Sequence, residues 1–342
     1  MLHVQSVSDQ APPSINGACV AAGGCIYIHG GTKAAAGGPP QAAIYKFEPP
    51  SATWTKLAED GPKLSHHDAF VTEDRFLNFV GGWDGRTRTH QVHVFDTITG
   101  KWMNTETTGF PAGAGLSSHT VTQLTDGSAM VIGRLGGLKT QRKTSAMLKI
   151  VGDQRKGFTY KVQKSEVESR GGHSIVAIDN SQVALFGGKH EPHRNMEVQL
   201  VPMPDVCYFS NHINLKKFLG EHVDQTGKNM FACRRYQAAA NDSEGRIICH
   251  GGEGFDQMMP SKQSEPRSDI AVWDTALMRK NCTLTQGQDA WYKLKLDQPL
   301  PPLTGHWLMM LGKRIFVVGG MKKGNKANTE TFEISETETL TE

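Results

Sequence analysis

Short apolar segments that end in glycine recur along the chain. In five of them a strand-like run leads directly into two adjacent glycines, and a sixth keeps only the first glycine, which an arginine follows. The glycines are Gly30 and Gly31, Gly81 and Gly82, Gly187 and Gly188, Gly251 and Gly252, Gly319 and Gly320, and the incomplete pair is Gly133 with Arg134. Successive first glycines are 51, 52, 54, 64 and 68 residues apart. A repeat of about 50 residues is typical of β-propellers, in which each repeat is one four-stranded blade.

A short polar segment opens each unit, 13 to 15 residues before its glycines. These segments are LSHHDAFV at 64–71, LSSHTVTQL at 116–124, RGGHSIVAI at 170–178, RRYQAAA at 234–240 and TGHWLMML at 304–311. The spacing predicts one strand, a tight turn and the glycine-terminated strand. Trp54, Trp102 and Trp291 mark the later strands of their units and are expected to fill the wedge between blades. Glycine at the end of the second strand permits positive φ and a close approach of neighbouring chains.

The last unit lacks a fourth strand. Its third strand is predicted at 329–334, and a polar tail follows at 335–342. The N-terminal LHVQSV at 2–7 is expected to supply the missing strand. The sequence therefore predicts an all-β, six-bladed propeller as a single domain over 1–334. Its blades are expected at about 14–58, 64–107, 116–163, 170–210, 234–295, and 304–334 together with 2–7.

Several of these motifs resemble the kelch superfamily. They are LSHHDA at 64–69, VGGWDGRTR at 80–88, AGLSSHTVT at 114–122, GRLGGLKTQR at 133–142 and SRGGHS at 169–174. The resemblance is most specific over residues 60–190. It implies a propeller that is used for protein contacts and has no known enzymatic chemistry.

Units four and five are longer than the others. Within HINLKKFLGEHV at 212–223, apolar residues at helical spacing predict an amphipathic helix. This helix either packs on its own propeller or docks a partner. A second insertion at 253–269 is rich in Met, Pro and Ser and is typical of a mobile loop.

Composition and charge narrow the class of protein. Hydrophobic residues make up 38% and charged residues 21%, and the net charge of +3 is too small to indicate nucleic-acid binding. The N-terminus has no pattern of a signal peptide, and no apolar run approaches the ~18 residues that a membrane span needs. The six cysteines form no C-x-x-C pair. We therefore expect a monomeric cytoplasmic or nuclear protein with reduced thiols.

Histidines occupy the same place in four units, where the first strand starts. They are His67, His119, His173 and His306, with His66 and Asp68 beside the first. Such regularity favours a repeated structural role, and the alternative is a metal or catalytic site at the channel mouth. The sequence HEPH at 190–193 is a second, weaker candidate for metal binding. No recognisable metal set, hydrolase elbow or phosphate loop is found, so no catalytic residue, metal or cofactor is predicted.

The loops that follow the glycines are expected to cluster on one face. Their charges sum to +6, against +3 for the whole chain, and the window 134–144 alone carries +4. A cationic, Arg-rich face suits an acidic peptide or a carboxylate terminus. We therefore expect a non-catalytic protein-binding scaffold or adaptor. Its partner-binding residues are predicted to be Arg86, Arg88, Arg134, Lys139, Arg142 and Arg170.

Two alternatives stay open. One is a propeller enzyme that acts on a small molecule at a histidine-lined or metal site. The other, within the binding class, is a substrate-recognition subunit of a ubiquitin ligase.

Overall fold

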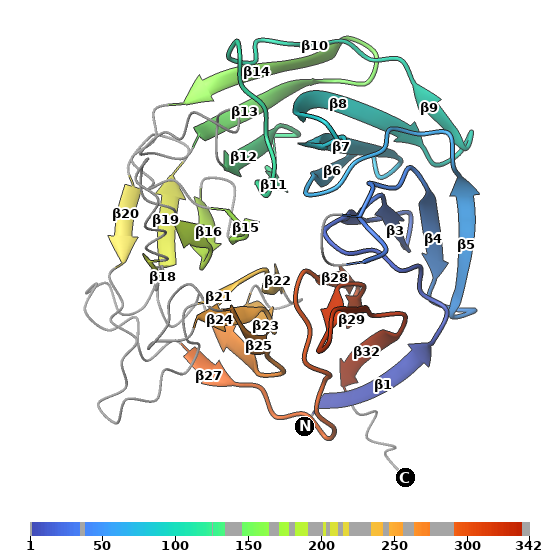
Figure 1. The fold of residues 1–342 in the computed structure, drawn as a ribbon, viewed down its shortest axis with the longest axis vertical. Coiled ribbons are helices and arrows are strands. Elements are labelled where there is room, and N and C mark those ends of the chain that lie inside the picture. Colours follow the sequence, from blue (N-terminus) through green and yellow to red (C-terminus); the bar gives the residue numbers. More distant parts are fainter. Residues whose placement is uncertain are drawn as a thin grey trace.

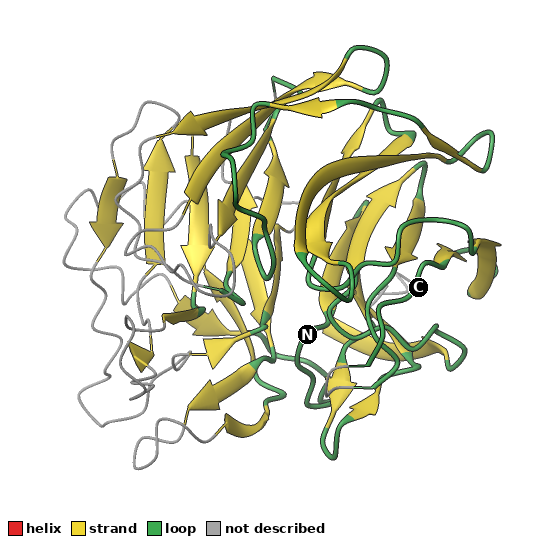
Figure 2. Cartoon of the chain, turned by 45° about the horizontal axis from the view of Figure 1, so that its top comes forward, coloured by secondary structure: helices red, strands yellow, loops and turns green. Residues whose placement is uncertain are grey.

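Strands account for all the regular secondary structure that the structure describes. The computed structural model of the protein describes the following residues: 2–34, 38–124, 126–133, 146–163, 171–177, 182–190, 201–202, 206–210, 215–218, 234–241, 246–255, 263–273 and 291–336. Within these ranges there is no helix (Figure 2). In the part of the chain that the structure describes, six sheets of four or five strands stand around a common centre (Figure 1). We number these sheets as blades one to six, in the chain order of their innermost strands.

The first three blades are built from consecutive antiparallel strands. Blade one contains β2 (Ala18–Ala22), β3 (Cys25–His29), β4 (Ile44–Glu48) and β5 (Thr53–Ala58). Blade two contains β6 (Asp68–Thr72), β7 (Phe76–Trp83), β8 (Arg88–Asp96) and β9 (Lys101–Met103). Blade three contains β11 (Thr120–Gln123), β12 (Ala129–Gly133), β13 (Ala146–Asp153), β14 (Gly157–Gln163) and an added parallel strand, β10 (Thr107–Thr108).

The remaining blades follow the same order from the centre outward. Blade four contains β15 (Ser174–Ala177), β16 (Gln182–Phe186), β19 (Val206–Ser210) and β20 (Leu215–Phe218). Blade five contains β22 (Ala238–Asn241), β23 (Ile247–His250), β26 (Ile270–Trp273) and β27 (Trp291–Lys293). Blade six contains β28 (Trp307–Leu311), β29 (Arg314–Val318), β32 (Thr331–Glu336) and β1 (Leu2–Ser8). Small accessory sheets are formed by β17 (Lys189–His190) with β18 (Val201–Pro202), by β21 (Arg234–Arg235), β24 (Glu253–Phe255) and β25 (Gln263–Pro266), and by β30 (Met321–Lys322) with β31 (Lys326–Ala327).

The N-terminal strand completes blade six, as the missing fourth strand predicts. β1 pairs antiparallel with β32, with Val4 opposite Ile334. Its other side is held by the segment that leads into blade six: the Val4 amide donates to Asp297 Oδ1 at 2.8 Å, and His3 contacts the same carboxylate. The two ends of the chain therefore lie together in one sheet (Figure 1).

The helix predicted near 212–223 is wrong where the structure describes it. Residues Leu215–Phe218 form β20, which pairs antiparallel with β19, with Phe209 opposite Leu215. The remainder of 212–223 lies outside the described residues. Pairing with β19 gives the backbone of this segment its hydrogen bonds, and such tertiary context overrides an apolar spacing that fits more than one structure. The fourth unit accordingly extends beyond the predicted boundary at 210.

Hydrophobic cores lie between blades rather than inside them. Phe70 and Val80 of blade two share one buried cluster with Val131 and Leu148 of blade three. A single sheet cannot bury both of its faces, so each blade depends on its two neighbours.

The tryptophans fill these interfaces where their side chains are described. Trp54 Nε1 donates to Thr331 Oγ1 of blade six at 3.0 Å. The ring of Trp102 in blade two lies 5.2 Å from that of His29 in blade one. Trp291 lies in β27, and its side chain is outside the described residues.

Candidate functional site: the loop face and the central channel

The repeated histidine is seated between two glycines, as blade two shows. A Cβ built on Gly82 of the same blade would lie 2.6 Å from the Cβ of His67, and one built on Gly30 of blade one would lie 2.9 Å from its Cε1. Both glycines have positive φ, 102° and 66°. Any side chain at either glycine would displace the histidine. The glycine pair and the histidine therefore form one interlocking unit across the blade interface.

The repeated histidines are buried and neutral. The Nδ1 of His29 lies 2.9 Å from Nε2 of His67, and the Nδ1 of His250 lies 2.8 Å from Nε2 of His306. Burial lowers the pKa of His119 to about 4 and holds the pKa values of His67 and His306 well below the ordinary value, so these three side chains are neutral. These contacts support the structural interpretation of the repeated histidines.

No metal site emerges from the described residues. Among them, no group of three or more His, Cys, Asp or Glu side chains is placed to hold a metal ion. His190 of the HEPH segment lies in β17. Residues 191–193 fall outside the described ranges.

Blade three departs from the glycine rule at the position where the sequence does. Ile132 pairs with Thr120, so the next residue, Gly133, lies opposite His119. In the other blades, too, the first glycine lies opposite the histidine position of the same blade. Its φ lies outside the left-handed region, unlike that of Gly81 in blade two. A Cβ on Gly133 would meet the Cβ of His119 at 2.4 Å, a contact that second glycines make elsewhere. The left-handed turn thus depends on the complete glycine pair.

A ring of left-handed residues surrounds one mouth of the central channel. They are the residues that precede the histidine position in each blade: Asn16, His66, Ser118, Gly172, Tyr236 and Gly305, with φ between 52° and 69°. Five of their amides donate to the carbonyl of the corresponding residue in the preceding blade, at 2.6 to 3.2 Å. Neighbouring blades are therefore tied backbone to backbone at this rim.

The loops that follow the glycines stand beside this rim. In blade two, Ser65 and Trp83 exchange backbone hydrogen bonds of 3.0 and 2.7 Å, which fixes the β7–β8 hairpin next to the segment that opens the blade. Arg86 is exposed at the tip of this hairpin. Arg88 pairs with Trp83 in this hairpin and so lies beside the segment that carries Ser65 and His66. Burial lowers the pKa of His66, and the nearby charge of Arg88 lowers it further.

The structure describes two of the six predicted partner-binding residues, and their role in binding stays a prediction. Arg86 and Arg88 lie together on the loop face. Arg134, Lys139, Arg142 and Arg170 lie outside the described residues.

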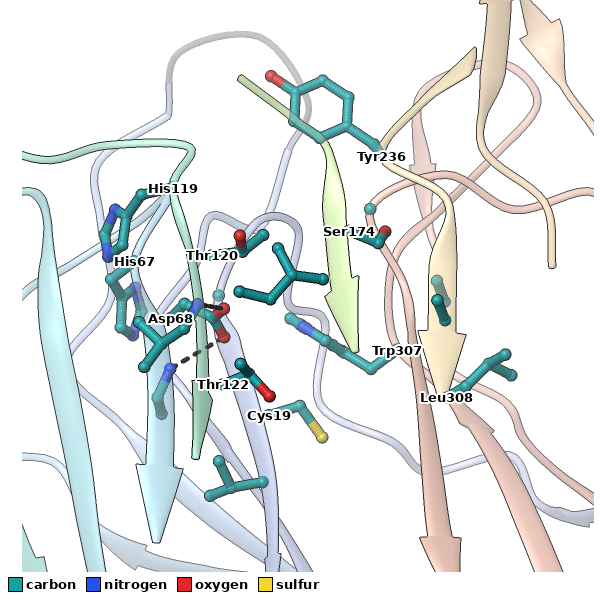
Figure 3. Close-up of a pocket in the computed structure, with 18 of the residues that line it drawn as sticks. Cys19, His67, Asp68, His119, Thr120, Thr122, Ser174, Tyr236, Trp307 and Leu308 are labelled. Carbon is teal, nitrogen blue, oxygen red and sulfur yellow. Dashed lines mark hydrogen bonds between the residues drawn. The ribbon is translucent and has the colours of Figure 1, made fainter. Parts of the chain in front are cut away.

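A pocket of about 400 Å³ occupies the channel inside the ring. The six left-handed residues and the innermost strands of all six blades line it. Figure 3 shows Asp68 projecting into it from β6 and Trp307 from β28. Asp68 Oδ2 accepts a hydrogen bond from the Val121 amide at 2.6 Å, and Oδ1 accepts one from the Ala69 amide at 2.9 Å. Burial raises the pKa of Asp68 to about 7.

Sequence reasoning missed a buried arginine in blade five, and it named Asp68 only as a neighbour of the first repeated histidine in the metal hypothesis. Arg234 is 1% exposed, and its guanidinium binds both carboxylate oxygens of Asp269 at 2.7 Å. The sequence contains one indication of each residue. Asp68 directly follows a repeated histidine, and Arg234 lies three residues before Gln237, which occupies the histidine position of blade five. No repetition marks either residue, because each occurs in one blade.

No model of a protein family matches the chain. Over 179 residues it is 35% identical to the human and the mouse proteins named kelch domain-containing protein 9. The match covers 50% of this chain and 51% of each relative, so the chain spans about half the length of the curated relatives it matches. A solved structure titled "Structure of YjhT" shares the fold with a TM-score of 0.68 and 16% identity, over 96% of this chain and 97% of that one.

These comparisons confirm the kelch resemblance and the β-propeller that the repeats predict. The structural likeness, at 16% identity, concerns the fold alone. Among the described residues, no helix has the length and apolar character that a bilayer crossing requires.

Proposed function

We propose that this propeller is a non-catalytic protein-binding scaffold that docks an acidic or carboxylate-terminated peptide on its loop face. The observation that carries the proposal is the placement of Arg86 and Arg88 together on one hairpin beside the channel mouth. Arginine presents a planar set of donors that matches a carboxylate. We further propose that the chain is a monomeric, intracellular, six-bladed ring, and that substrate recruitment for a ubiquitin ligase is one use of such a scaffold.

The geometry of the β7–β8 turn supports recognition by side chains. Asp84 Oδ1 accepts hydrogen bonds from the amides of Arg86 and Thr87, both at 2.7 Å, and so fixes the turn. A fixed turn presents the exposed Arg86 at a constant place and lowers the entropic cost of binding.

The rival enzyme hypothesis draws on the repeated histidines. Their side chains pack against glycines between blades, with exposed fractions of 3 to 4%. A general base must reach the proton that it abstracts, and such burial therefore gives this hypothesis no support.

Peptide display tests the proposal directly. A library of acidic, basic and neutral peptides, with free and amidated C-termini, is selected on the wild-type protein and on the Arg86→Glu/Arg88→Glu variant. We expect the wild type to enrich acidic or free-carboxylate peptides and the double variant to lose them.

The matched control is Arg155→Glu. Arg155 is exposed in the turn between β13 and β14, beside a pocket lined by the other turns of blades two and three, away from the channel mouth. This variant should select the same peptides as the wild type. Equal enrichment by the double variant, or no preference for acidic peptides in the wild type, would refute docking on these arginines.

A further inference from the structure

The residue that follows the histidine position is neutral in five blades and acidic in one. Five blades have a neutral residue there: Ala18, Thr120, Ser174, Ala238 and Trp307. Blade two alone has a carboxylate, Asp68. In blades three and four this residue links its blade to the next one, through Thr120 Oγ1 and Nε2 of His173 at 2.8 Å, and through Ser174 Oγ, which donates to the Gln237 carbonyl at 2.6 Å. A neutral hydroxyl therefore meets the structural need at this position.

The Asp68 carboxylate has no cationic partner among the described residues that act on it. Its two hydrogen bonds come from the backbone amides of Val121 and Ala69. Burial raises its pKa to about 7, these two amides lower it in part, and no lysine or arginine contributes. A carboxylate offers about four acceptor positions, so about two are left. A charge held inside a protein without a counter-ion is costly, and such groups normally pair with a cation.

The surrounding pocket has room and chemistry for that cation. Among the described residues that line it, Asp68 is the one with a carboxyl group, and burial lowers the pKa of His66, His67 and His119, which favours their neutral forms. Figure 3 shows the indole of Trp307 extending from β28 into the pocket, and the same side chain packs against buried residues of blades one and six. An aromatic face attracts cations, most strongly when it is indole and shielded from water.

We propose that the channel pocket binds one organic cation, an alkylammonium or a guanidinium group, with Asp68 as its counter-ion and Trp307 as the aromatic face on which it packs. Arg86 and Arg88 are not among the residues that line the pocket. The proposal thus stands independently of docking on the loop face, and each can fail without the other.

Calorimetric titration with propylamine and with agmatine, at pH 8, tests the site. We expect saturable 1:1 binding to the wild type. Asp68→Asn should weaken it about tenfold or more, since a hydrogen bond to a charged group contributes roughly 1.5–3 kcal/mol. The matched control is Asp153→Asn, the same substitution at a turn aspartate of blade three that does not line the pocket, and it should bind as the wild type does.

A second variant guards against misfolding. Asp68→Thr introduces the residue that blade three carries at the same position, Thr120, and should fold while binding amines as weakly as Asp68→Asn does. In the wild type, affinity should fall about tenfold from pH 8 to pH 6 as Asp68, with its pKa of about 7, takes up a proton. Equal affinity of wild type and both variants overturns the proposal, as does the absence of amine binding to the wild type.

The cation could belong to a small molecule or to a side chain of a docked protein. A parallel titration with a blocked tripeptide that has an arginine between two glutamates distinguishes the two sources. Asp68-dependent binding of the free amines identifies a small-molecule site. Asp68-dependent binding of the tripeptide alone assigns the cation to a side chain of a docked protein. Calcium or potassium chloride that binds in preference to the amines would show a metal-ion site and contradict the proposal.

Discussion

Blades two and five share a backbone but differ in the chemistry placed on it. Three residues before the histidine position, blade two buries Leu64 and blade five buries Arg234, paired with Asp269. At the histidine position itself, blade two has His67 and blade five has Gln237. In both, the second glycine of the preceding blade donates its amide to the first of these residues, at 2.8 Å for Leu64 and 2.9 Å for Arg234.

The comparison teaches that the backbone features of the ring recur whatever side chains occupy these positions. Left-handed residues, glycine pairs and inter-blade amide bonds recur in blades whose side chains at the same positions are apolar, cationic or titratable. Side chains at the interface are therefore free to diverge, and a blade can acquire a functional group such as Asp68 while its geometry stays constant.

The largest expected effect concerns the ion pair of Arg234 in blade five, at the position where blade two has Leu64. Asp269→Ala leaves the guanidinium of Arg234 buried without its partner, which typically costs about 3–5 kcal/mol. Chemical denaturation should show this loss in the free energy of unfolding. A loss below 1 kcal/mol would mean that the backbone carbonyl of Gly251, which also accepts from Arg234, suffices.

The double variant Arg234→Leu/Asp269→Ala imitates Leu64 and supplies the control. Replacing a buried ion pair by apolar residues is often neutral. We expect its stability to lie well above that of Asp269→Ala. If both variants are equally unstable, blade five requires the ion pair for its geometry.

The second-largest loss of stability is expected where the glycine pair packs against the histidine. Gly82→Ala places a Cβ 2.6 Å from the Cβ of His67 at a φ of 102°, and we expect a loss of about 2–3 kcal/mol from strain and displacement together. The control Gly324→Ala has a φ of 78° and nothing within 4 Å, and should cost about 1 kcal/mol from the left-handed backbone alone. Thermal denaturation of the two variants gives the difference, and equal midpoints would refute the interlock.

The histidine and glutamine positions predict a difference in pH dependence. Burial lowers the pKa of His119 to about 4, below the unfolded value of about 6.5. The unfolded chain therefore takes up the proton first, so stability is fully present above pH 6.5 and falls as the pH drops toward 4. His119→Gln, which copies Gln237, should flatten the wild-type curve between pH 7 and pH 5 by about 2 kcal/mol.

Comparing wild type with variant removes the opposite effect of Asp68, whose raised pKa stabilises the fold as the pH falls. Urea denaturation at pH 7, 6 and 5 measures both curves. Parallel curves would contradict a neutral, buried His119.

The smallest expected effect concerns the rim. Ser118 has a φ of 52°, whereas blade four has Gly172 at the same position. Ser118→Gly should raise the free energy of unfolding by up to about 1 kcal/mol, because glycine adopts this conformation without strain. Ser118→Val should lower it. A destabilised glycine variant would show that the Ser118 side chain contributes more than its conformation costs.

The sequence was informative wherever a feature recurs in phase. The glycine pairs, the histidine position and the missing last strand each follow from repetition, and the structure places them in the same relation in successive blades. The positive φ of Gly82 and the wedge position of Trp102 follow from the same physical needs at each interface.

Features that occur once were not predictable in this way. The pairing of β23 with β26 brings Asp269 next to Arg234 in blade five. The partner of Asp68 is the Val121 amide, which belongs to β11 of the next blade. At 215–218, apolar residues at a spacing compatible with a helix form a strand because β19 offers an edge to pair with. Local pattern carries no information about such partners.

The closure of blade six sets the order in which the protein can be completed. β1 is synthesised before the rest of the propeller, whereas its partners, β32 and the segment around Asp297, follow about 290 residues or more later in the chain. The edge of β1 therefore stays unpaired until these partners have been made. A circular permutant that links β32 to β1 and opens the propeller between two other blades would make the two strands neighbours in the sequence, and it should refold faster than the order found here.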